Sequence, residues 1–429
     1  MLMLLGYLMV LTFMVLIMTK RMSALVALTV VPIVFGLLAG HGADLGAMAV
    51  DGISKLAPTA TLLLFAVLYF AVMIDAGLFD PLVGRVLKFA GDDPVRVSLG
   101  TAILALVVAL DGDGATTALI TVTAFLPVYR RLGMNPLVLA VNLGSASCVM
   151  NLTPWGGPMG RAAAALHIDP SDIFVPLLPT WAAGIAGTLL IAWHLGRRER
   201  GRIAVEGTEV HGAGGPILFD RDETLRRPGL FYFNLALTLA ILGAAISGIV
   251  PLPLVFMIGL SIALLVNYPK VSQQGERIQA HAENGLPIVL LILAAGSFTG
   301  VMQGTGMIDA MADGAVTLIP PELGPHIGVV TAFLAMPLTF VLSNDAFYFG
   351  VVPVIAETAS HYQVAPEVIA RASLLALPIH GLSPLIAAIY LLAGLIGKDV
   401  GEMQRFGLKW AFLLSLILIA AATLTGVIL

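Results

Sequence analysis

The sequence predicts an all-α polytopic membrane protein made of two inverted copies of one fold. The chain has 429 residues, of which 59% are hydrophobic and 11% charged, whereas a soluble domain is about 25% charged. Several apolar stretches approach the roughly 20 residues that span a bilayer as a helix. The third observation is that these stretches are interrupted at matching places in the two halves of the chain. An outer-membrane barrel would alternate apolar and polar residues instead.

The two halves share their Gly and Pro positions. Pro58 and Pro287 have the same separation along the chain as Gly77 and Gly306. The other matches are Val72, Met73 and Asp80 with Val301, Met302 and Asp309, and Pro136 and Pro154 with Pro366 and Pro384. A duplicated apolar chain broken by Gly, Pro and polar residues is typical of a secondary transporter, which binds its substrate at the breaks.

The apolar stretches predict the elements in order. The first half has spans near 2–18, 23–40 and 57–75, an amphipathic stretch near 77–90, short arms at 96–110 and 115–129, and segments at 137–167 and 173–195. After a polar loop, the second half has 230–249, 253–267, 287–304, arms at 327–342 and 346–357, then 367–397 and 405–428. Arms too short to span the bilayer predict two re-entrant helical hairpins beside about ten full transmembrane helices, two of them broken.

Basic residues set the orientation. If the N-terminus faces outward, most basic residues fall on one side of the membrane, which is then the cytoplasmic side. They include Lys20, Arg21, Arg130, Arg131 and the cluster Arg197–Arg202. The rule predicts an inner (plasma) membrane protein with both termini outside. An odd number of crossings in each half, about five, inverts the second half relative to the first. A single cysteine, Cys148, excludes an internal disulfide.

Four polar interruptions are the candidate site. The hairpin tips are 111–117, with Asp111, Asp113 and Thr116, and 343–345, with Ser343, Asn344 and Asp345. The helix breaks are 151–158, with Asn151, Thr153, Gly156 and Gly157, and 380–384, with His380, Gly381 and Ser383. We expect the polar side chains at the tips to cap the returning helices. Thr153 before Pro154 and Ser383 before Pro384 predict helix starts at those prolines.

Helix N-termini that meet inside the membrane attract an anion. The carboxylates Asp113 and Asp345 would repel it, and a charge inside the membrane needs a partner, either a proton or a hard cation with oxygen ligands. Alternatives stay open for single residues. Asp113 and Asp345 could stabilise the tips, His380 could relay protons or sit satisfied in the core, and Arg161 could bind substrate or anchor its helix.

Four segments resemble the citrate–divalent metal:proton symporter family of the ion transporter superfamily: 16–21, 68–81, Leu110–Gly114 and Pro154–Pro158. The resemblance implies transport of citrate as its complex with a divalent cation of the Mg²⁺ or Ca²⁺ type, together with protons and with no permanently bound cofactor. It further implies an elevator motion and a homodimer. The scaffold would be 1–76 and 229–305, the moving transport parts 77–196 and 306–429, and the cytoplasmic linker 197–228.

The tips and breaks give the expected residue roles for such a carrier. Substrate contacts are expected from Asn151, Thr153, Gly156, Gly157, Ser343, Asn344, Gly381 and Ser383, and metal or proton coupling from Asp111, Asp113, Thr116, Asp345 and His380. Related dicarboxylate carriers bind sodium with Ser-Asn-Thr at both tips, and the acidic tips here favour protons or a divalent metal. On this view Asp113→Asn and Asp345→Asn abolish coupled uptake.

Other functions fit less well. The nearest alternative is a sodium- or proton-coupled carrier of a free di- or tricarboxylate or another small anion. An intramembrane aspartyl protease would need Gly where Leu110 stands, and there is no His-Glu-x-x-His metalloprotease motif. No channel filter is recognisable. We therefore expect a transporter in the lipid bilayer, with no enzymatic activity and no nucleic-acid partner.

Overall fold

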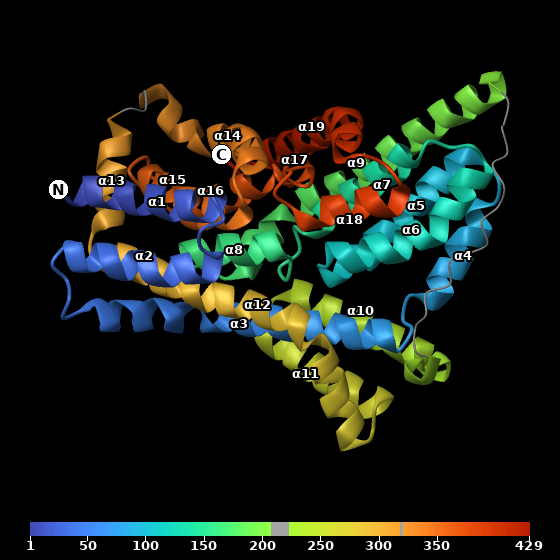
Figure 1. The fold of residues 1–429 in the computed structure, drawn as a ribbon, viewed down its shortest axis with the longest axis horizontal. Helices are drawn as coiled ribbons and strands as arrows, with labels where there is room; N and C mark the ends of the chain where they lie inside the picture. The colour runs from blue at the N-terminus through green and yellow to red at the C-terminus, as the bar shows by residue number, and fades with distance from the viewer. Residues whose placement is uncertain (207–222, 318–320) are drawn as a thin grey trace.

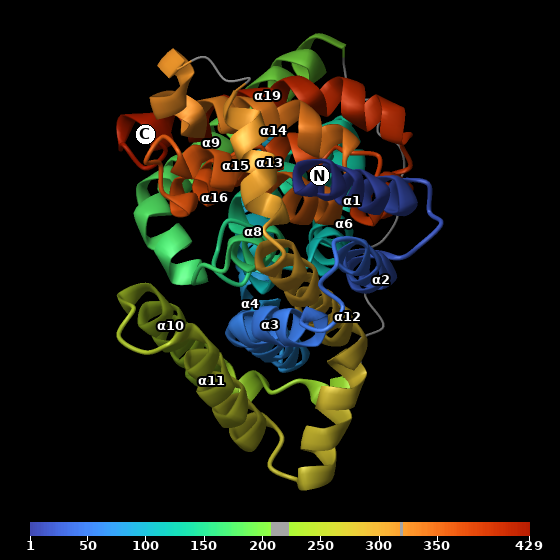
Figure 2. The same ribbon diagram turned by 90° about the vertical axis from the view of Figure 1, so that its left-hand side faces the viewer.

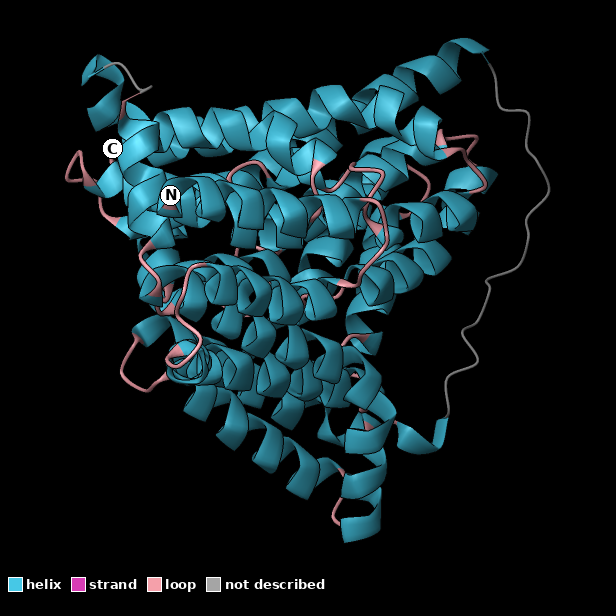
Figure 3. Cartoon of the chain, turned by 60° about the vertical axis from the view of Figure 1, so that its left-hand side comes forward, coloured by secondary structure: helices cyan, strands magenta, loops and turns pink. Residues whose placement is uncertain are grey.

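The computed structural model describes residues 1–206, 223–317 and 321–429, and these ranges contain helices, turns and loops but no β-strand (Figure 3). The expected linker 197–228 falls partly outside them. Both chain ends lie in the left part of Figure 1. An all-helical protein was the prediction, and it is confirmed.

The first half contains nine α-helices. They are α1 (Leu2–Met18), α2 (Ala24–Leu38), α3 (Leu45–Asp75), α4 (Asp80–Ala90), α5 (Pro94–Val108), α6 (Gly114–Arg131), α7 (Pro136–Met150), α8 (Gly157–Leu166) and α9 (Pro170–Glu206). A short 3₁₀ turn, Ala109–Asp111, continues α5. Asp93 and Asn135 cap α5 and α7 from the residue before a proline, the arrangement in which Pro starts a helix.

The second half runs through a similar series. Its helices are α10 (Phe231–Ser247), α11 (Leu252–Asn267), α12 (Val271–Gly304), α13 (Met307–Val316), α14 (Ile327–Val341), α15 (Val352–Ser360), α16 (Pro366–Leu374), α17 (Leu377–His380), α18 (Ala387–Ile396) and α19 (Val400–Leu424). A π-helical turn, Ala346–Val351, precedes α15. Further 3₁₀ turns are Glu223–Leu225, Pro228–Leu230 and Pro321–His326.

Seven helices of the described residues are long and apolar enough to cross a membrane. Two of them, Pro94–Asp111 and Glu322–Val341, contain the first arms of the expected hairpins, so these arms are longer than the sequence suggested. The first arm gains Pro94 and Val95 at its start and Asp111 at its end, and the 3₁₀ turn Pro321–His326 lengthens the second. Other apolar helices, such as α1, α2, α7 and α11, are shorter, and the count of about ten complete crossings stays a prediction.

Helices α3 and α12 form the main contact between the two halves. A Cβ atom on Gly52 of α3 would lie 2.0 Å from the carbonyl oxygen of Gly296, and one on Gly300 would lie 2.3 Å from that of Met48. Gly296, Gly300 and Gly304 are four residues apart and share one helix face. Such small-residue faces let membrane helices approach backbone to backbone. Helix α2 packs beside α12, and α10 and α11 project beside α3 (Figure 2).

Polar contacts fasten this region and its surroundings. Asp75, expected to end a helix at the membrane edge, bonds Arg277 at 3.2 Å and His281 at 2.7 Å on α12. Helix α1 contacts α2 but also α13, where the Tyr7 hydroxyl donates to the Met311 carbonyl at 2.9 Å. The N-terminal helix therefore bridges segments that the resemblance assigns to scaffold and to transport parts.

Candidate functional site

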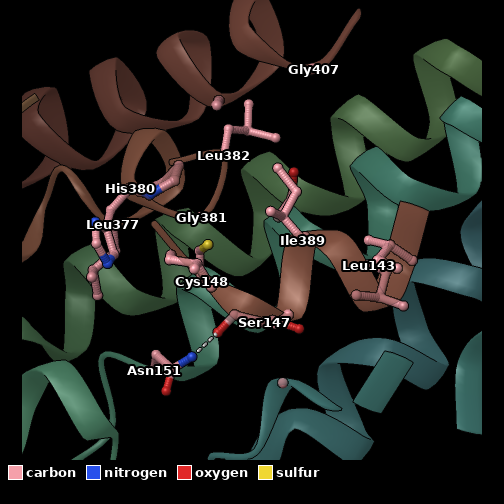
Figure 4. A pocket seen from close by; sticks show the side chains of 18 of the residues that line it. Leu143, Ser147, Cys148, Asn151, Leu377, His380, Gly381, Leu382, Ile389 and Gly407 are labelled. Atoms are coloured by element: carbon pink, nitrogen blue, oxygen red, sulfur yellow. Dashed lines mark hydrogen bonds between the residues drawn. The ribbon is translucent and has the colours of Figure 1, made fainter. Parts of the chain in front are cut away.

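Both predicted tips and both predicted breaks contribute to one cavity of about 280 Å³. Its wall includes Gly112 from the first tip, Asn151 from the first break, Asn344 from the second tip and His380 from the second break. Figure 4 shows Asn151, Cys148, His380 and Gly381 around this space. Residues far apart in the sequence thus meet at one place, and their roles in binding remain predictions.

The first break follows α7. Asn151 donates from Nδ2 to the Ser147 carbonyl at 3.0 Å, one turn back (Figure 4), while the Ser147 hydroxyl is buried without a partner. A Cβ on Gly156 would lie 2.2 Å from the Asn151 carbonyl oxygen, so the turn is closed by a contact that requires glycine. Thr153 donates to the Met150 carbonyl at 2.8 Å and is buried away from the cavity wall.

The helices after both breaks begin later than predicted. Helix α8 starts at Gly157 with Gly156 as its N-cap, and α18 starts at Ala387 with Ile386 as its N-cap. The expectation that Thr153 and Ser383 cap helices starting at the next proline is therefore wrong. Thr153 is part of a turn closed by the Gly156 N–H, and Ser383 donates to the Phe340 carbonyl at 2.7 Å in the facing hairpin.

Helices α8 and α18 both lack a side-chain cap. Gly157 and Pro158 of α8 line the cavity, as do Ile386 and Ala388 at the start of α18. The first N–H groups of a helix have no partner within the helix, and the helix dipole adds partial positive charge there. Two such ends, one from each half, thus border the same cavity.

The first hairpin tip is capped by its own carboxylate. Asp113 accepts hydrogen bonds from the Ala115 and Thr116 N–H groups, at 3.0 Å each, and from the Thr116 hydroxyl. Asp111, 5% exposed, accepts from the Asp113 N–H at 2.8 Å. The cavity wall here is formed by Gly112 and Gly114. The predicted cap is confirmed, and it neutralises the N-terminus of α6.

If Asp113 acts only as this cap, Asp113→Asn should retain uptake, because Asn caps as well as Asp. In that case uptake in proteoliposomes is near normal, and the melting temperature falls only slightly, because the amide keeps one of the two acceptor oxygens. Asp113→Ala, which removes the cap, should lose about 1 kcal/mol of stability. Loss of uptake in the Asn variant with stability intact would give the carboxylate a coupling role, as the sequence suggested.

The first break and the first tip are fastened to each other. The Trp155 indole N–H donates to the Leu110 carbonyl at 2.7 Å. The same ring packs against Phe70 of α3 and Phe256 of α11, with centroids 5.9 Å and 5.1 Å away. Trp155 therefore joins the tip to the break by a hydrogen bond, and both to α3 and α11 by aromatic contact.

The second tip places three polar residues differently. Ser343 accepts from the Ala346 N–H at 3.2 Å and caps the returning segment, as predicted. The Asn344 side-chain oxygen is buried without a partner and Asn344 lines the cavity. Asp345 accepts from Arg161 Nε of α8 at 2.7 Å. Of the three, Asn344 is the residue whose polar group is left for a ligand.

His380, a residue of the cavity wall, has one ring nitrogen with a defined partner and one without. Its side chain is 3% exposed, and Nδ1 lies 2.6 Å from the Thr339 carbonyl oxygen. A carbonyl oxygen only accepts, so Nδ1 carries the proton, and Nε2 of the neutral ring has a free lone pair. Nε2 is buried without a partner. It can accept a proton or bind a cation.

Sequence reasoning missed some members of the site. Ser147 lies one helical turn before Asn151 and Cys148 faces Gly381, where a Cβ would lie 2.6 Å from the sulfur. The four-residue spacing from Asn151 was the available signal for Ser147. Among the described residues, no three His, Cys, Asp or Glu side chains lie together as metal ligands. Two residues of the cavity wall each have a buried acceptor atom without a partner, His380 Nε2 and Asn344 Oδ1.

Comparison with known proteins points to one family. A family model described as "Citrate transporter" matches residues 13–376. A "Citrate transporter" of Bacillus subtilis (strain 168) is 50% identical over 428 residues, covering 100% of both chains. A "Mg(2+)/citrate complex secondary transporter" of the same organism is 46% identical over 430 residues, covering 100% of this chain and 99% of that one.

Two solved structures share the fold at low identity. The Alcanivorax borkumensis YdaH transporter matches with a TM-score of 0.55 and 13% identity, over 89% of this chain and 88% of that one. Neisseria gonorrhoeae MtrF matches with a TM-score of 0.56 and 16% identity, over 90% and 84%. Both likenesses concern the fold alone.

Proposed function

Because the chain belongs to the citrate transporter family, we propose that it imports citrate as a divalent metal complex in symport with protons. The family and its relatives are transporters and not enzymes. The relative named for a Mg²⁺/citrate complex supports a metal complex as cargo here. A cation of the Mg²⁺ or Ca²⁺ type would enter as part of the substrate, through the oxygen ligands of citrate.

The observation that carries this proposal is the pair of uncapped helix ends at one cavity. The starts of α8 and α18 offer N–H groups to the carboxylate oxygens of citrate, one set from each half of the chain. Asn151 and backbone groups at Gly156, Gly157 and Gly381 would complete the anion site. Thr153, Ser343 and Ser383 would act by holding the turns and tips in place.

A second set of residues would bind the coupled proton or the metal. His380 Nε2 would accept a proton or approach the metal, and the Asn344 oxygen would add a cation ligand. Asp345 would take part through its ion pair with Arg161. Asp111, Asp113 and Thr116 stay candidates for coupling at the first tip, where they already bond one another.

We further propose an elevator motion in a homodimer. In this mechanism α2, α3 and α10–α12 form the scaffold in the inner membrane, with both chain ends outside. The hairpins and broken helices α5–α8 and α14–α18 move as the transport part. The matched order of elements in the two halves and the opposite orientation expected from the basic residues support an inverted repeat.

Uptake into proteoliposomes tests the proposal directly. With labelled citrate and an inward proton gradient, we expect uptake with Mg²⁺ or Ca²⁺ and loss of uptake when EDTA removes the metal. Collapsing the proton gradient with an uncoupler should stop accumulation, and replacing sodium should not. Undiminished uptake in EDTA would contradict a metal complex as cargo and support the alternative, a sodium- or proton-coupled carrier of the free di- or tricarboxylate.

A further inference from the structure

An ion pair next to the cavity wall joins the two halves of the chain. Arg161 on α8 donates from Nε to Asp345 Oδ1 at 2.7 Å, and both side chains are 19% exposed. Arg161 also donates from Nη1 to the Gly157 carbonyl at 3.2 Å. Gly157 and Asn344, the residue before Asp345, line the cavity. The ion pair therefore lies directly behind two residues of the cavity wall, and one donor of the guanidinium is held by a carboxylate of the protein.

We propose that Arg161 binds a carboxylate of the substrate, and that Asp345 holds Arg161 in the empty site as an internal carboxylate which the substrate displaces. This inference rests on the proposed function and adds to it a binding residue and an exchange step. A planar guanidinium matches a carboxylate better than any other side chain, and it pairs with whichever carboxylate is offered in that geometry.

The net charge of the site before and after the exchange predicts that a proton is taken up. In the empty site the charges of Arg161 and Asp345 cancel. A fully ionised citrate that holds a divalent cation keeps a single negative charge, which cancels Arg161 in turn. The displaced Asp345 would then be an unpaired carboxylate in a mostly buried place, which is strongly disfavoured. We infer that it takes up a proton from water, so both the empty and the loaded site are neutral.

Few other titratable groups face this pair. His380 on α17 is close enough to interact electrostatically with both Arg161 and Asp345. Tyr348 lies three residues after Asp345 in the same segment. Cys148 on α7 lines the neighbouring cavity. Helices α1 and α14 carry no acidic or basic side chain, and Glu357 on α15 accepts from Ser360 instead. Helix α16 also packs on α8 and carries Glu367 and Arg371, of which Arg371 donates to the Val427 carbonyl.

The far end of α8 adds no charge to the pair. Burial, with the nearby Lys55 charge, lowers the pKa of His167, the residue that follows this helix, to about 4. At neutral pH the ring is therefore uncharged, and Arg161 is the charged side chain of the segment Gly157–His167.

Calorimetric titration of the purified protein with preformed Mg²⁺–citrate tests the exchange. In wild type we expect the Kd to rise about tenfold for each unit of pH increase over the range where one proton is taken up. Buffers of different ionisation enthalpy should report about one proton bound per substrate. Asp345→Asn, which removes the competitor, should bind more tightly at neutral pH and take up no proton.

Variants of Arg161 complete the test. Arg161→Gln should weaken binding by about 10- to 100-fold, the loss of a hydrogen bond to a charged group. In the double variant Arg161→Gln/Asp345→Asn the gain from the Asp345 change should vanish, because that gain requires Arg161. Asp75→Asn breaks the similarly buried pair with Arg277, whose side chains are 15% and 17% exposed. It should leave both the Kd and the proton uptake as in wild type.

The outcomes separate this inference from the proposed function. Failure of the wild type to bind Mg²⁺–citrate at any pH would contradict the proposed function itself. If the wild type binds but Asp345→Asn weakens binding as much as Arg161→Gln, the pair is structural and the exchange is wrong. Proton uptake that persists in Asp345→Asn would overturn the role of Asp345 as the proton acceptor.

Discussion

Replacing Gly300 with leucine is expected to leave almost no correctly folded protein in the membrane. A Cβ there would lie 2.3 Å from the Met48 carbonyl oxygen and 3.0 Å from the Gly52 Cα, and both are backbone atoms. A backbone contact cannot be relieved by a rotamer change, so α3 and α12 would have to separate. Overpacking of a tight core costs about 1–3 kcal/mol even where side chains can adjust, and here they cannot.

Detergent extraction followed by size-exclusion chromatography and a thermal melt would measure this loss. Gly275→Leu is the matched control, because Gly275 is on the same helix and a Cβ there meets nothing within 4 Å. It should behave as wild type. A monodisperse Gly300→Leu protein with the wild-type melting temperature would show that the two helices do not depend on their close approach.

The second large effect is expected at His380. His380→Gln removes the buried ring nitrogen Nε2, which has no partner, yet its amide can still donate to the Thr339 carbonyl. If Nε2 accepts the coupled proton or approaches the metal, uptake at limiting Mg²⁺–citrate should fall by about 10- to 100-fold, the range for disturbed metal coordination. Protein yield and melting temperature should change little.

His194→Gln provides the comparison for His380→Gln. His194 is exposed and stacks on Trp410 at 5.5 Å, outside the cavity wall. Its uptake should match the wild type. Uptake by His380→Gln equal to that of His194→Gln would make His380 a core residue that only supports the hairpin through Thr339.

The sequence alone predicted those contacts that a residue makes with its neighbours in the chain. Asp113 and Ser343 were predicted to cap the returning helices, and both do, because a cap is made within three residues. The breaks were recognised from Gly and Pro for the same reason. Their exact ends were missed by a few residues, since the helices begin at Gly157 and Ala387. Thr153 donates within the preceding turn, and Ser383 donates to the facing hairpin while it accepts from the Leu385 N–H.

Long-range contacts carried no such signal. Arg161 and Asp345 are 184 residues apart, so their pairing could not be read from either neighbourhood. Helices α3 and α12 are also longer than predicted, and their polar ends explain why. Asp51 and Lys55 pair within α3 at 2.7 Å, and Asp75 of α3 compensates Arg277 of α12. Because these charged residues have partners, they remain in the helices, although a prediction from apolar stretches leaves them out.

The aromatic contact around Trp155 has a mechanical consequence. The hydrogen bond from Trp155 to the Leu110 carbonyl holds the first break to the first tip, so neither can move away without breaking it. Toward α3 and α11, however, Trp155 meets Phe70 and Phe256 through ring surfaces alone. Dispersion contacts have no fixed direction and re-form after a shift of a few ångströms, whereas hydrogen bonds would have to break first. If the transport part moves as proposed, Trp155 can therefore shift against Phe70 and Phe256 while its hydrogen bond to the first tip stays intact.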